Sequence, residues 1–206
     1  MKKRMLSIMF MSFLCVCNLS AESKIVKMVE KQMVEIPGKS FLMMRTEVTQ
    51  ELYEAVMGEN PSQFKGKNKP VDSVDISDIL IFCNKLSEMC GLRPVYLING
   101  ETDFRKINHY EMKRIVYRHQ NYFWCDYSNN GHGFRLPTEE EWMYCAKGGK
   151  KYKYSGSDNL DEVGWYSGNS GDKTHEVATK KANGYGLYDM SGNVEELINA
   201  VVARYS

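Results

Sequence analysis

Oxygen-bearing side chains gather near the end of the chain, in the stretch G-L-Y-D-M-S-G-N-V-E-E-L that begins at Gly186. Asp189, Asn193, Glu195 and Glu196 lie within eight residues of one another. Hard cations such as Ca²⁺ bind several oxygen ligands and mix carboxylates with backbone carbonyls. Glycine in such a turn lets the carbonyls converge without a steric penalty from Cβ. Two interpretations remain open: a plain surface turn, which the residues alone favour, and a cation-binding loop.

The histidines and cysteines form no pattern of this kind. His109 and His119 lie ten residues apart and have no partner at metal-ligand spacing. No cysteine pair has the C-x-x-C spacing that is typical of zinc sites. We therefore predict no metal centre built from these residue types.

Four of the six cysteines lie beyond the first 21 residues: Cys83, Cys90, Cys125 and Cys145. Cys83 and Cys90 fall on one predicted helix, where a separation of seven residues corresponds to about 10 Å. A disulfide needs Cα atoms within about 7 Å of each other, so this pair is expected to stay unbonded. We expect Cys83 to be a small buried apolar residue, and a functional thiol is the alternative.

The first 21 residues are typical of a secretory signal peptide. A positively charged start, M-K-K-R, precedes an apolar run that is too short for a comfortable membrane span. Ser20 and Ala21 supply small residues for cleavage, and lipidation of Cys15 or Cys17 is the alternative processing route. We expect a periplasmic, secreted or cell-surface protein whose mature chain has no transmembrane span.

The bulk composition is that of an ordinary globular domain. The chain has 206 residues, of which 43% are hydrophobic and 26% charged, and its net charge is +1. This length suffices for one core, and the charge lacks the basic surplus of a nucleic-acid-binding protein. We predict a linker at residues 22–32 and one domain at residues 33–206.

Short elements with clear caps must position the candidate residues. The sequence predicts a hairpin around Pro37–Gly38, helices from Thr49 to Gly58, from Asp75 or Ser77 to Gly91 and from Thr138 to Gly148, and a strand within 95–100. Thr138 and Glu141 match a capping box, so the acids of that helix start are interpreted as caps and not as catalysts. Few long periodic elements and many turns predict an irregular α+β domain.

Four segments, at residues 47–66, 70–88, 133–149 and 183–194, resemble the formylglycine-generating enzyme (sulfatase-modifying factor) family in the same order. The last two contain R-L-P-T-E-x-E-W and G-L-Y-D-M-x-G-N-V, which are hallmark runs of that family. The resemblance extends from about Met33 to about Glu196. It implies an irregular α+β fold related to C-type lectins, with little regular secondary structure. The activity that it implies is oxidation of a sulfatase cysteine to formylglycine.

The resemblance also implies a structural calcium site. In the family, the stretch that matches Y-D-M-S-G-N-V-E-E wraps around a calcium ion. Carried over, Asp189 and Glu196 would supply side-chain oxygens, and Gly192 and Val194 would supply backbone carbonyls. The family match therefore favours the cation-binding interpretation over the surface turn.

The chain departs from the family pattern in several places. The family has tryptophans where this chain has Glu195 and Leu197, so the apolar packing that would hold the acid between them is expected to be lost. A second family calcium site lies upstream, and Asn169 and Asp172 match it by residue type without an aligned spacing.

The catalytic cysteines are the largest departure. Family enzymes use a cysteine pair that binds copper(I), a soft ion suited to thiolates. That pair lies in the C-terminal third of the family domain, after the stretch that matches residues 183–194. The last residues of this sequence are I-N-A-V-V-A-R-Y-S and contain no cysteine. We therefore expect a domain without its C-terminal third, with no catalytic residue and no copper site.

Two main functions follow from the resemblance. One is enzymatic modification of an exported protein or peptide, for which this polypeptide is expected not to be competent alone. The other is a lectin-like module that binds a surface ligand or a protein, as in the variable proteins diversified by retroelements. A sulfoxide synthase of the ergothioneine type ranks last, because it needs a histidine-rich helical domain upstream.

Overall fold

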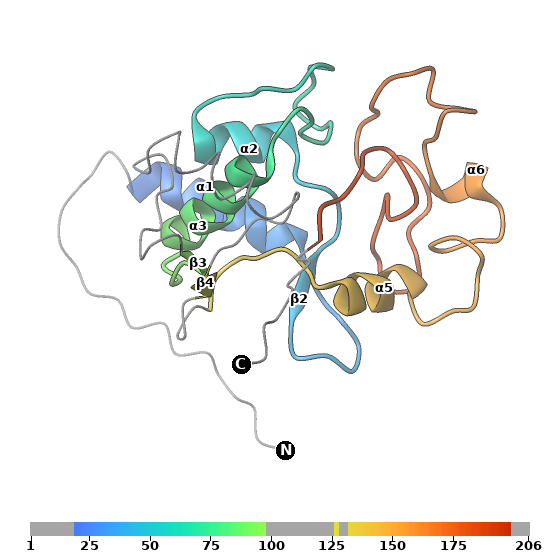
Figure 1. The fold of residues 1–206 in the computed structure, drawn as a ribbon, viewed down its shortest axis with the longest axis horizontal. Coiled ribbons are helices and arrows are strands. Elements are labelled where there is room, and N and C mark those ends of the chain that lie inside the picture. Colours follow the sequence, from blue (N-terminus) through green and yellow to red (C-terminus); the bar gives the residue numbers. More distant parts are fainter. Residues whose placement is uncertain (1–18, 98–125, 128–131, 199–206) are drawn as a thin grey trace.

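A computed structural model describes residues 19–97, 126–127 and 132–198 of the chain. Three helices occupy one side of the molecule, and a loop-rich part with two short helices occupies the other (Figure 1). The elements in chain order are α1 (Leu19–Gln32), β1 (Met33–Glu35), β2 (Leu42–Met44), α2 (Gln50–Met57), α3 (Ile76–Met89), β3 (Tyr96–Leu97), β4 (Asp126–Tyr127), α5 (Glu139–Lys147) and α6 (Leu160–Val163). Short helices and two small sheets confirm the predicted irregular α+β class.

The strands form two separate antiparallel pairs. β1 pairs with β2 in a register that sets Met33 opposite Met44, around the turn predicted at Pro37–Gly38. Gly38 adopts a φ of 75°, which a glycine tolerates without a Cβ clash. β3 pairs with β4 in the same antiparallel sense. The predicted hairpin is confirmed.

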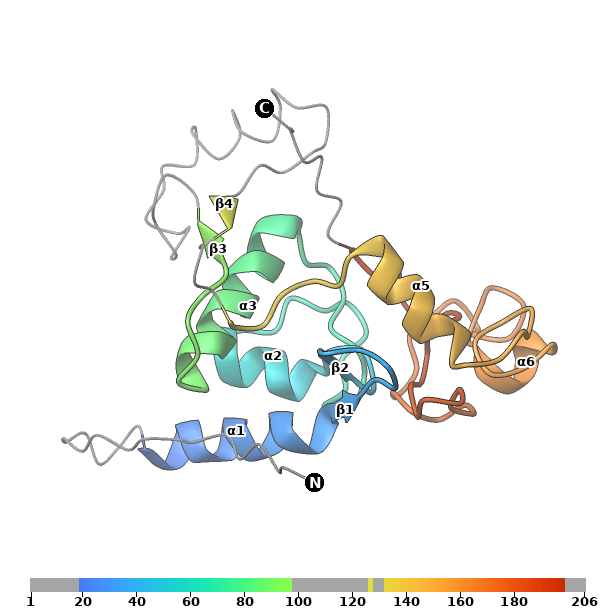
Figure 2. The same cartoon turned by 90° about the horizontal axis from the view of Figure 1, so that it is seen from below.

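Residues 22–32, which the sequence analysis predicts to be a linker, instead form most of α1. Ile25 and Val29 recur at helical spacing and are 3% and 4% exposed in the main core. In Figure 2 this helix lies alongside α2, with α3 beyond it. An apolar stripe on an otherwise polar segment explains the difference, because packing against α2 and α3 stabilises a helix whose own sequence signal is weak.

Both caps of α2 and the N-cap of α3 are those that the sequence predicts, whereas α3 ends with Cys90 as its C-cap, one residue before the predicted Gly91. The hydroxyl of Thr49 accepts from the Leu52 backbone N–H, and Gly58 closes α2 in a left-handed conformation. Asp75 starts α3 with a reciprocal capping box to Asp78. Together with α1 these helices enclose the main core, in which Tyr53 and Phe82 stack at 5.4 Å.

A second, smaller core joins α5 to the hairpin and to the C-terminal loop. Ile36, Cys145 and Leu187 are its buried members. The Asn183 amide donates to the Cys145 carbonyl at 2.8 Å, while its own oxygen accepts from the Tyr185 and Leu187 N–H groups. These contacts place residues 186–197, called the acidic loop below, against α5.

The described cysteines, Cys83, Cys90 and Cys145, are all free. The prediction that Cys83 and Cys90 do not pair is confirmed, and Cys83 is buried as expected. Cys125, His109 and His119 lie outside the described residues. No helix in the described part of the chain is long and apolar enough to cross a membrane.

Candidate cation site

The acidic loop is held in a sharply turned conformation by backbone contacts. The Tyr188 N–H donates to the Arg45 carbonyl at 2.8 Å, and the Asn193 N–H donates to the Trp165 carbonyl at 2.8 Å. Asp189 and Asn193 both have positive φ, 58° and 71°. A Cβ on Gly192 would lie 2.2 Å from the Trp165 carbonyl oxygen, so the turn requires glycine there. Residues far apart in the chain therefore determine the shape of the loop.

Asp189 has one satisfied and one unsatisfied carboxylate oxygen. The residue is 2% exposed, and its Oδ2 accepts from the Ala178 N–H at 2.7 Å. Its Oδ1 is buried and has no hydrogen-bond partner. Burial raises the pKa of this carboxyl, and the hydrogen bond from Ala178 opposes the rise. A buried carboxylate oxygen without a partner is unfavourable, which points to a missing ligand.

Glu196 approaches this position from the far end of the loop. Its Oε2 accepts from the indole N–H of Trp142 on α5. Although the residue as a whole is exposed, desolvation of its carboxylate raises its pKa, and the nearby Asp189 adds to the rise. Trp142, the tryptophan of the R-L-P-T-E-x-E-W run, thus contacts this acid from a different element of the fold.

Glu47, between β2 and α2, is a third acid of the site that the sequence analysis did not identify. Its Oε2 accepts from the Asn193 side-chain amide at 2.8 Å, and its Oε1 accepts from the Val194 N–H at 3.2 Å. Burial, followed by the charges of Asp189 and Glu196, raises the pKa of Glu47 to about 9. Both oxygens accept hydrogen bonds, as suits an ionised carboxylate, whereas the surroundings disfavour ionisation.

The site thus combines hydrogen bonds that favour an ionised Glu47 with burial and charge repulsion that oppose its ionisation. None of the three acids forms an ion pair with a basic side chain in the described part of the chain. A cation near Asp189 would lower the repulsion among them and satisfy the free oxygen. The sequence analysis did not identify Glu47, because its hydrogen-bond partners lie 146 and 147 positions away in the chain.

The ligand set would have to include backbone oxygens. Within the described residues, no three His, Cys, Asp or Glu side chains are grouped closely enough to hold a metal ion by themselves. The predicted set of Asp189, Glu196 and the Gly192 and Val194 carbonyls contains only two side chains. Mixed carboxylate and carbonyl oxygens suit Ca²⁺, so the residues present fit this ion.

Asn169 and Asp172, which match the second family calcium site by residue type, lie in the loop after α6. The side chain of Asn169 is hydrogen-bonded within that loop, since its oxygen accepts from the Tyr166 N–H and its amide donates to Asp161 and to the Gly164 carbonyl. Asp172 is exposed. Asn169 therefore stabilises the loop itself.

An aromatic layer supports the loop from the other side. The Trp165 ring stacks on the His175 ring with centroids 3.7 Å apart, and the Lys180 ammonium lies 3.9 Å from the indole centroid. Asn193 accepts from the His175 N–H and donates to the His175 carbonyl. Asn193 thereby connects this layer to Glu47.

The described thiols are poor candidates for chemistry. Burial raises the pKa of Cys83 to about 12, and burial followed by the charge of Glu141 raises that of Cys145 to about 11. The pKa of Cys90 is also raised, mainly by burial. All three thiols therefore keep their protons at neutral pH.

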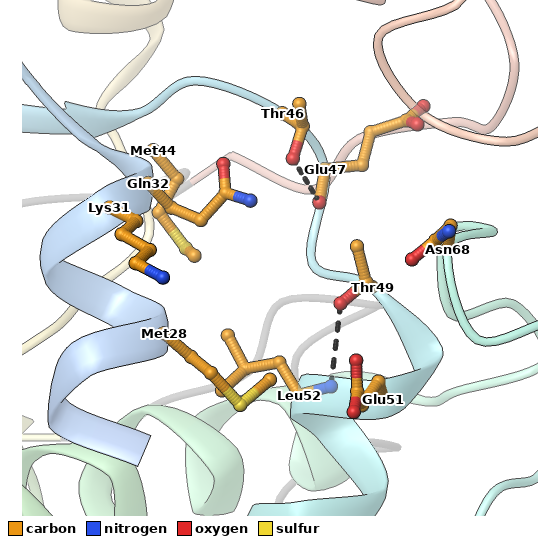
Figure 3. A pocket seen from close by; sticks show the side chains of 10 residues that line it. All are labelled: Met28, Lys31, Gln32, Met44, Thr46, Glu47, Thr49, Glu51, Leu52 and Asn68. Atoms are coloured by element: carbon orange, nitrogen blue, oxygen red, sulfur yellow. Dashed lines mark hydrogen bonds between the residues drawn. The ribbon is translucent and has the colours of Figure 1, made fainter. Parts of the chain in front are cut away.

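A small polar cavity of about 180 Å³ lies next to the site, between the end of α1 and the start of α2. Figure 3 shows the Glu47 carboxylate pointing away from Thr49 and Leu52, which line the cavity with it. The Gln32 Oε1 on its wall is buried without a hydrogen-bond partner. The cavity and the acidic loop are thus separate features that share only the Glu47 side chain.

Comparison with known proteins places the chain among characterised relatives. Residues 18–205 match the model of the sulfatase-modifying factor enzyme 1-like domain. The chain is 40% identical over 180 residues to the chaperone protein LppX of Paenibacillus barcinonensis, a match that covers 76% of this chain and 60% of that protein. It is 37% identical over 84 residues to the formylglycine-generating enzyme of Mycobacterium tuberculosis, covering 31% and 26% of the two chains. The chain thus spans less than two thirds of the length of these relatives.

A solved structure shares the fold. Treponema denticola variable protein 1 superimposes with a TM-score of 0.66 at 38% identity, over 85% of this chain and 72% of that chain. The irregular arrangement of short helices and loops is therefore common to both proteins.

Proposed function

The chain belongs to the formylglycine-generating enzyme (sulfatase-modifying factor) family, and from this we propose that it is an exported, calcium-stabilised module that binds another exported protein as a chaperone does. The match to LppX carries this proposal, because it extends over 180 residues at 40% identity. The match to the mycobacterial enzyme extends over 84 residues. Treponema denticola variable protein 1 shares the fold at 38% identity, and variable proteins are the class for which the sequence resemblance implies binding.

The chemistry of the described cysteines also favours binding over oxidation. Family oxidation needs thiolates that bind a cuprous ion. Cys83 and Cys145 are buried, and their raised pKa values keep them protonated at neutral pH. A binding role requires no reactive thiol.

Calcium has a structural part in this proposal. Asp189 and Glu196 would hold the ion with carboxylate oxygens, and Gly192 and Val194 with carbonyls. The buried, unpartnered Oδ1 of Asp189 supports this assignment. The bound ion would supply positive charge among carboxylates that otherwise repel one another. The loop would then keep one conformation for the surfaces around it.

Export is part of the same proposal. The charged start, the apolar run and the small residues Ser20 and Ala21 support it. An exported chaperone of this kind would meet its client outside the cytoplasm, where calcium is plentiful enough to fill weak sites.

Cysteine oxidation is the second candidate function, and the match to the mycobacterial formylglycine-generating enzyme favours it. The expected reaction would convert the thiol of an exported peptide to an aldehyde. It would require a copper-binding thiolate pair that none of the described cysteines provides.

The two candidates are separated by two assays on the exported, purified chain. In the first, light scattering follows the aggregation of reduced α-lactalbumin with and without the protein in calcium buffer, with serum albumin as a control. In the second, mass spectrometry follows a cysteine-containing sulfatase peptide in the presence of copper and oxygen. Slower aggregation without conversion supports the proposal. Conversion without an effect on aggregation supports the second candidate, and neither effect would reject both.

A further inference from the structure

Glu47 joins two parts of the molecule that are distant in sequence. The backbone after Glu47 is fixed by two hydrogen bonds to the segment before α3. The Val71 N–H donates to the Val48 carbonyl at 2.9 Å, and the Gln50 N–H donates to the Lys69 carbonyl. On the other side, the Arg45 carbonyl accepts from Tyr188 of the acidic loop. The backbone on both sides of Glu47 is therefore held, at Val48 by the Val71 N–H and at Arg45 by the acidic loop.

The contact with the loop uses both carboxylate oxygens. One accepts from the Asn193 amide at 2.8 Å, and the other accepts from the Val194 N–H at 3.2 Å. Val194 also donates to the Gly192 carbonyl at 3.1 Å, so its N–H is shared between two acceptors. The turn from Gly192 to Val194 is thus held by two backbone N–H groups. That of Asn193 donates to the Trp165 carbonyl, and that of Val194 donates to Glu47.

Asn193 is the centre of this arrangement. Its side chain contacts Glu47 and both backbone groups of His175, while its own φ is 71°. Few side chains adopt this left-handed conformation readily, and asparagine is one of them. The loop therefore reaches its shape only when Glu47 and the His175 segment are both in place.

We propose that Glu47 is a positioning residue of the cation site, which holds the turn that carries the Gly192 and Val194 carbonyls. Both of its oxygens accept hydrogen bonds from the loop, so its role in this proposal is to hold the turn. This inference rests on the calcium site proposed above. It makes cation binding dependent on contact between the segment before α2 and the C-terminal loop.

The dependence on calcium distinguishes positioning from a merely structural role. Glutamine keeps the size of the Glu47 side chain and one of its two acceptor oxygens, so one of the contacts with Asn193 and Val194 is lost in the variant. In the calcium-bound protein the same change loosens the turn that presents the carbonyls. A structural role would lower stability equally in both states, whereas a positioning role lowers it mainly in the calcium-bound state.

The test compares Glu47→Gln with Glu54→Gln in the full chain. Glu54 is exposed on α2, so its substitution makes the same chemical change away from the loop. Isothermal titration with Ca²⁺ is expected to show affinity at least tenfold weaker for Glu47→Gln and unchanged for Glu54→Gln. Tb³⁺ luminescence excited through Trp142, which contacts Glu196, reports the same site by an independent signal.

A second variant protects the test against misfolding. Asn193→Gly keeps the positive φ without strain and removes the amide that contacts Glu47. It is expected to weaken Ca²⁺ binding by a similar factor. Wild-type affinity in both Glu47→Gln and Asn193→Gly would overturn the positioning role and leave the calcium site intact. No binding of Ca²⁺ or Tb³⁺ by the unsubstituted protein would overturn the calcium site and this inference together.

Discussion

The two oxygens of Asp189 have different surroundings. One accepts a hydrogen bond from Ala178, and the other is buried without a partner. Carboxylates in protein interiors are normally paired or fully hydrogen-bonded, because an unpaired buried charge is strongly unfavourable. A cation bound at the free oxygen would therefore stabilise the folded state.

We predict that Asp189→Asn removes the response of the protein to calcium. Asparagine keeps the size of the side chain and tolerates the φ of 58° at this position. Ca²⁺ affinity should fall at least tenfold, about 1.4 kcal/mol, because the charged ligand is lost. The melting temperature without calcium should stay unchanged or rise, since a buried charge disappears. Thermal unfolding in calcium and in chelator measures both effects.

The control is Asp172→Asn. Asp172 is exposed and also has a positive φ, 55°, so the same change is made in the same backbone conformation. It should leave the calcium response intact. An equal loss of response in the two variants would mean that Asp189 is not a ligand.

At the level of elements, the start of α5 couples stability to pH. Arg135 donates two hydrogen bonds of 2.7 Å to Glu141, which also closes the capping box with Thr138. These hydrogen bonds, with that from Arg135 first, hold the pKa of Glu141 below its usual range. A carboxyl with a lowered folded pKa contributes stability above its unfolded pKa, and this contribution is lost as the pH falls through the folded pKa.

We therefore predict that Glu141→Gln flattens the acid side of the stability profile. Urea unfolding from pH 6 down to pH 3 should show a smaller loss of stability in this variant than in the unsubstituted protein. Glu140→Gln is the control, since Glu140 is exposed in the same first turn. Parallel acid limbs in all three proteins would contradict the role of the Arg135–Glu141 pair.

Helix α1 offers a second prediction at this level. Ile25 is 3% exposed within the main core, so Ile25→Ala leaves a cavity. The free energy of unfolding should fall by about 2 to 5 kcal/mol. Lys27→Ala, on the exposed face of the same helix, should change it by less than about 0.5 kcal/mol. Equal effects in urea unfolding would show that α1 does not belong to the cooperative core.

For the whole molecule, the proposed cation site depends on parts that the chain separates widely. Glu47 lies before α2, whereas Asp189 and Glu196 lie beyond α6, and Figure 1 shows this C-terminal segment running between the helical part and the outer loops. A ligand that binds only the folded state stabilises it by mass action. Calcium binding should therefore stabilise the entire fold and not the loop alone.

We predict that unfolding is one cooperative transition whose midpoint rises with Ca²⁺. At a calcium concentration of 100 Kd the gain is about 2.7 kcal/mol, which corresponds to roughly 5 to 10 °C for a domain of this size. Scanning calorimetry in calcium and in chelator measures the shift. Mg²⁺ at the same concentration is the control, because it prefers a smaller octahedral site and gives up its water reluctantly. A cooperative transition at the same temperature in all three buffers would contradict the calcium site.

The predictions from sequence succeeded where the deciding interactions are local. Thr49, Asp75 and Thr138 start their helices as expected, because a cap depends on groups two or three residues away. The hairpin at Pro37–Gly38 was predictable for the same reason. The helix at residues 22–32 was not predictable, because it depends on packing against α2 and α3.

The family, the capped elements and the acidic loop with Asp189 and Glu196 could be predicted from the sequence, since each of them depends on contiguous residues. The surroundings of that loop depend on contacts between distant parts of the chain. Tertiary packing brings Glu47 to Asn193 across 146 positions and brings Trp142 of α5 to Glu196. The physical reason is that burial and charge repulsion depend on distances in space, and long-range packing sets those distances.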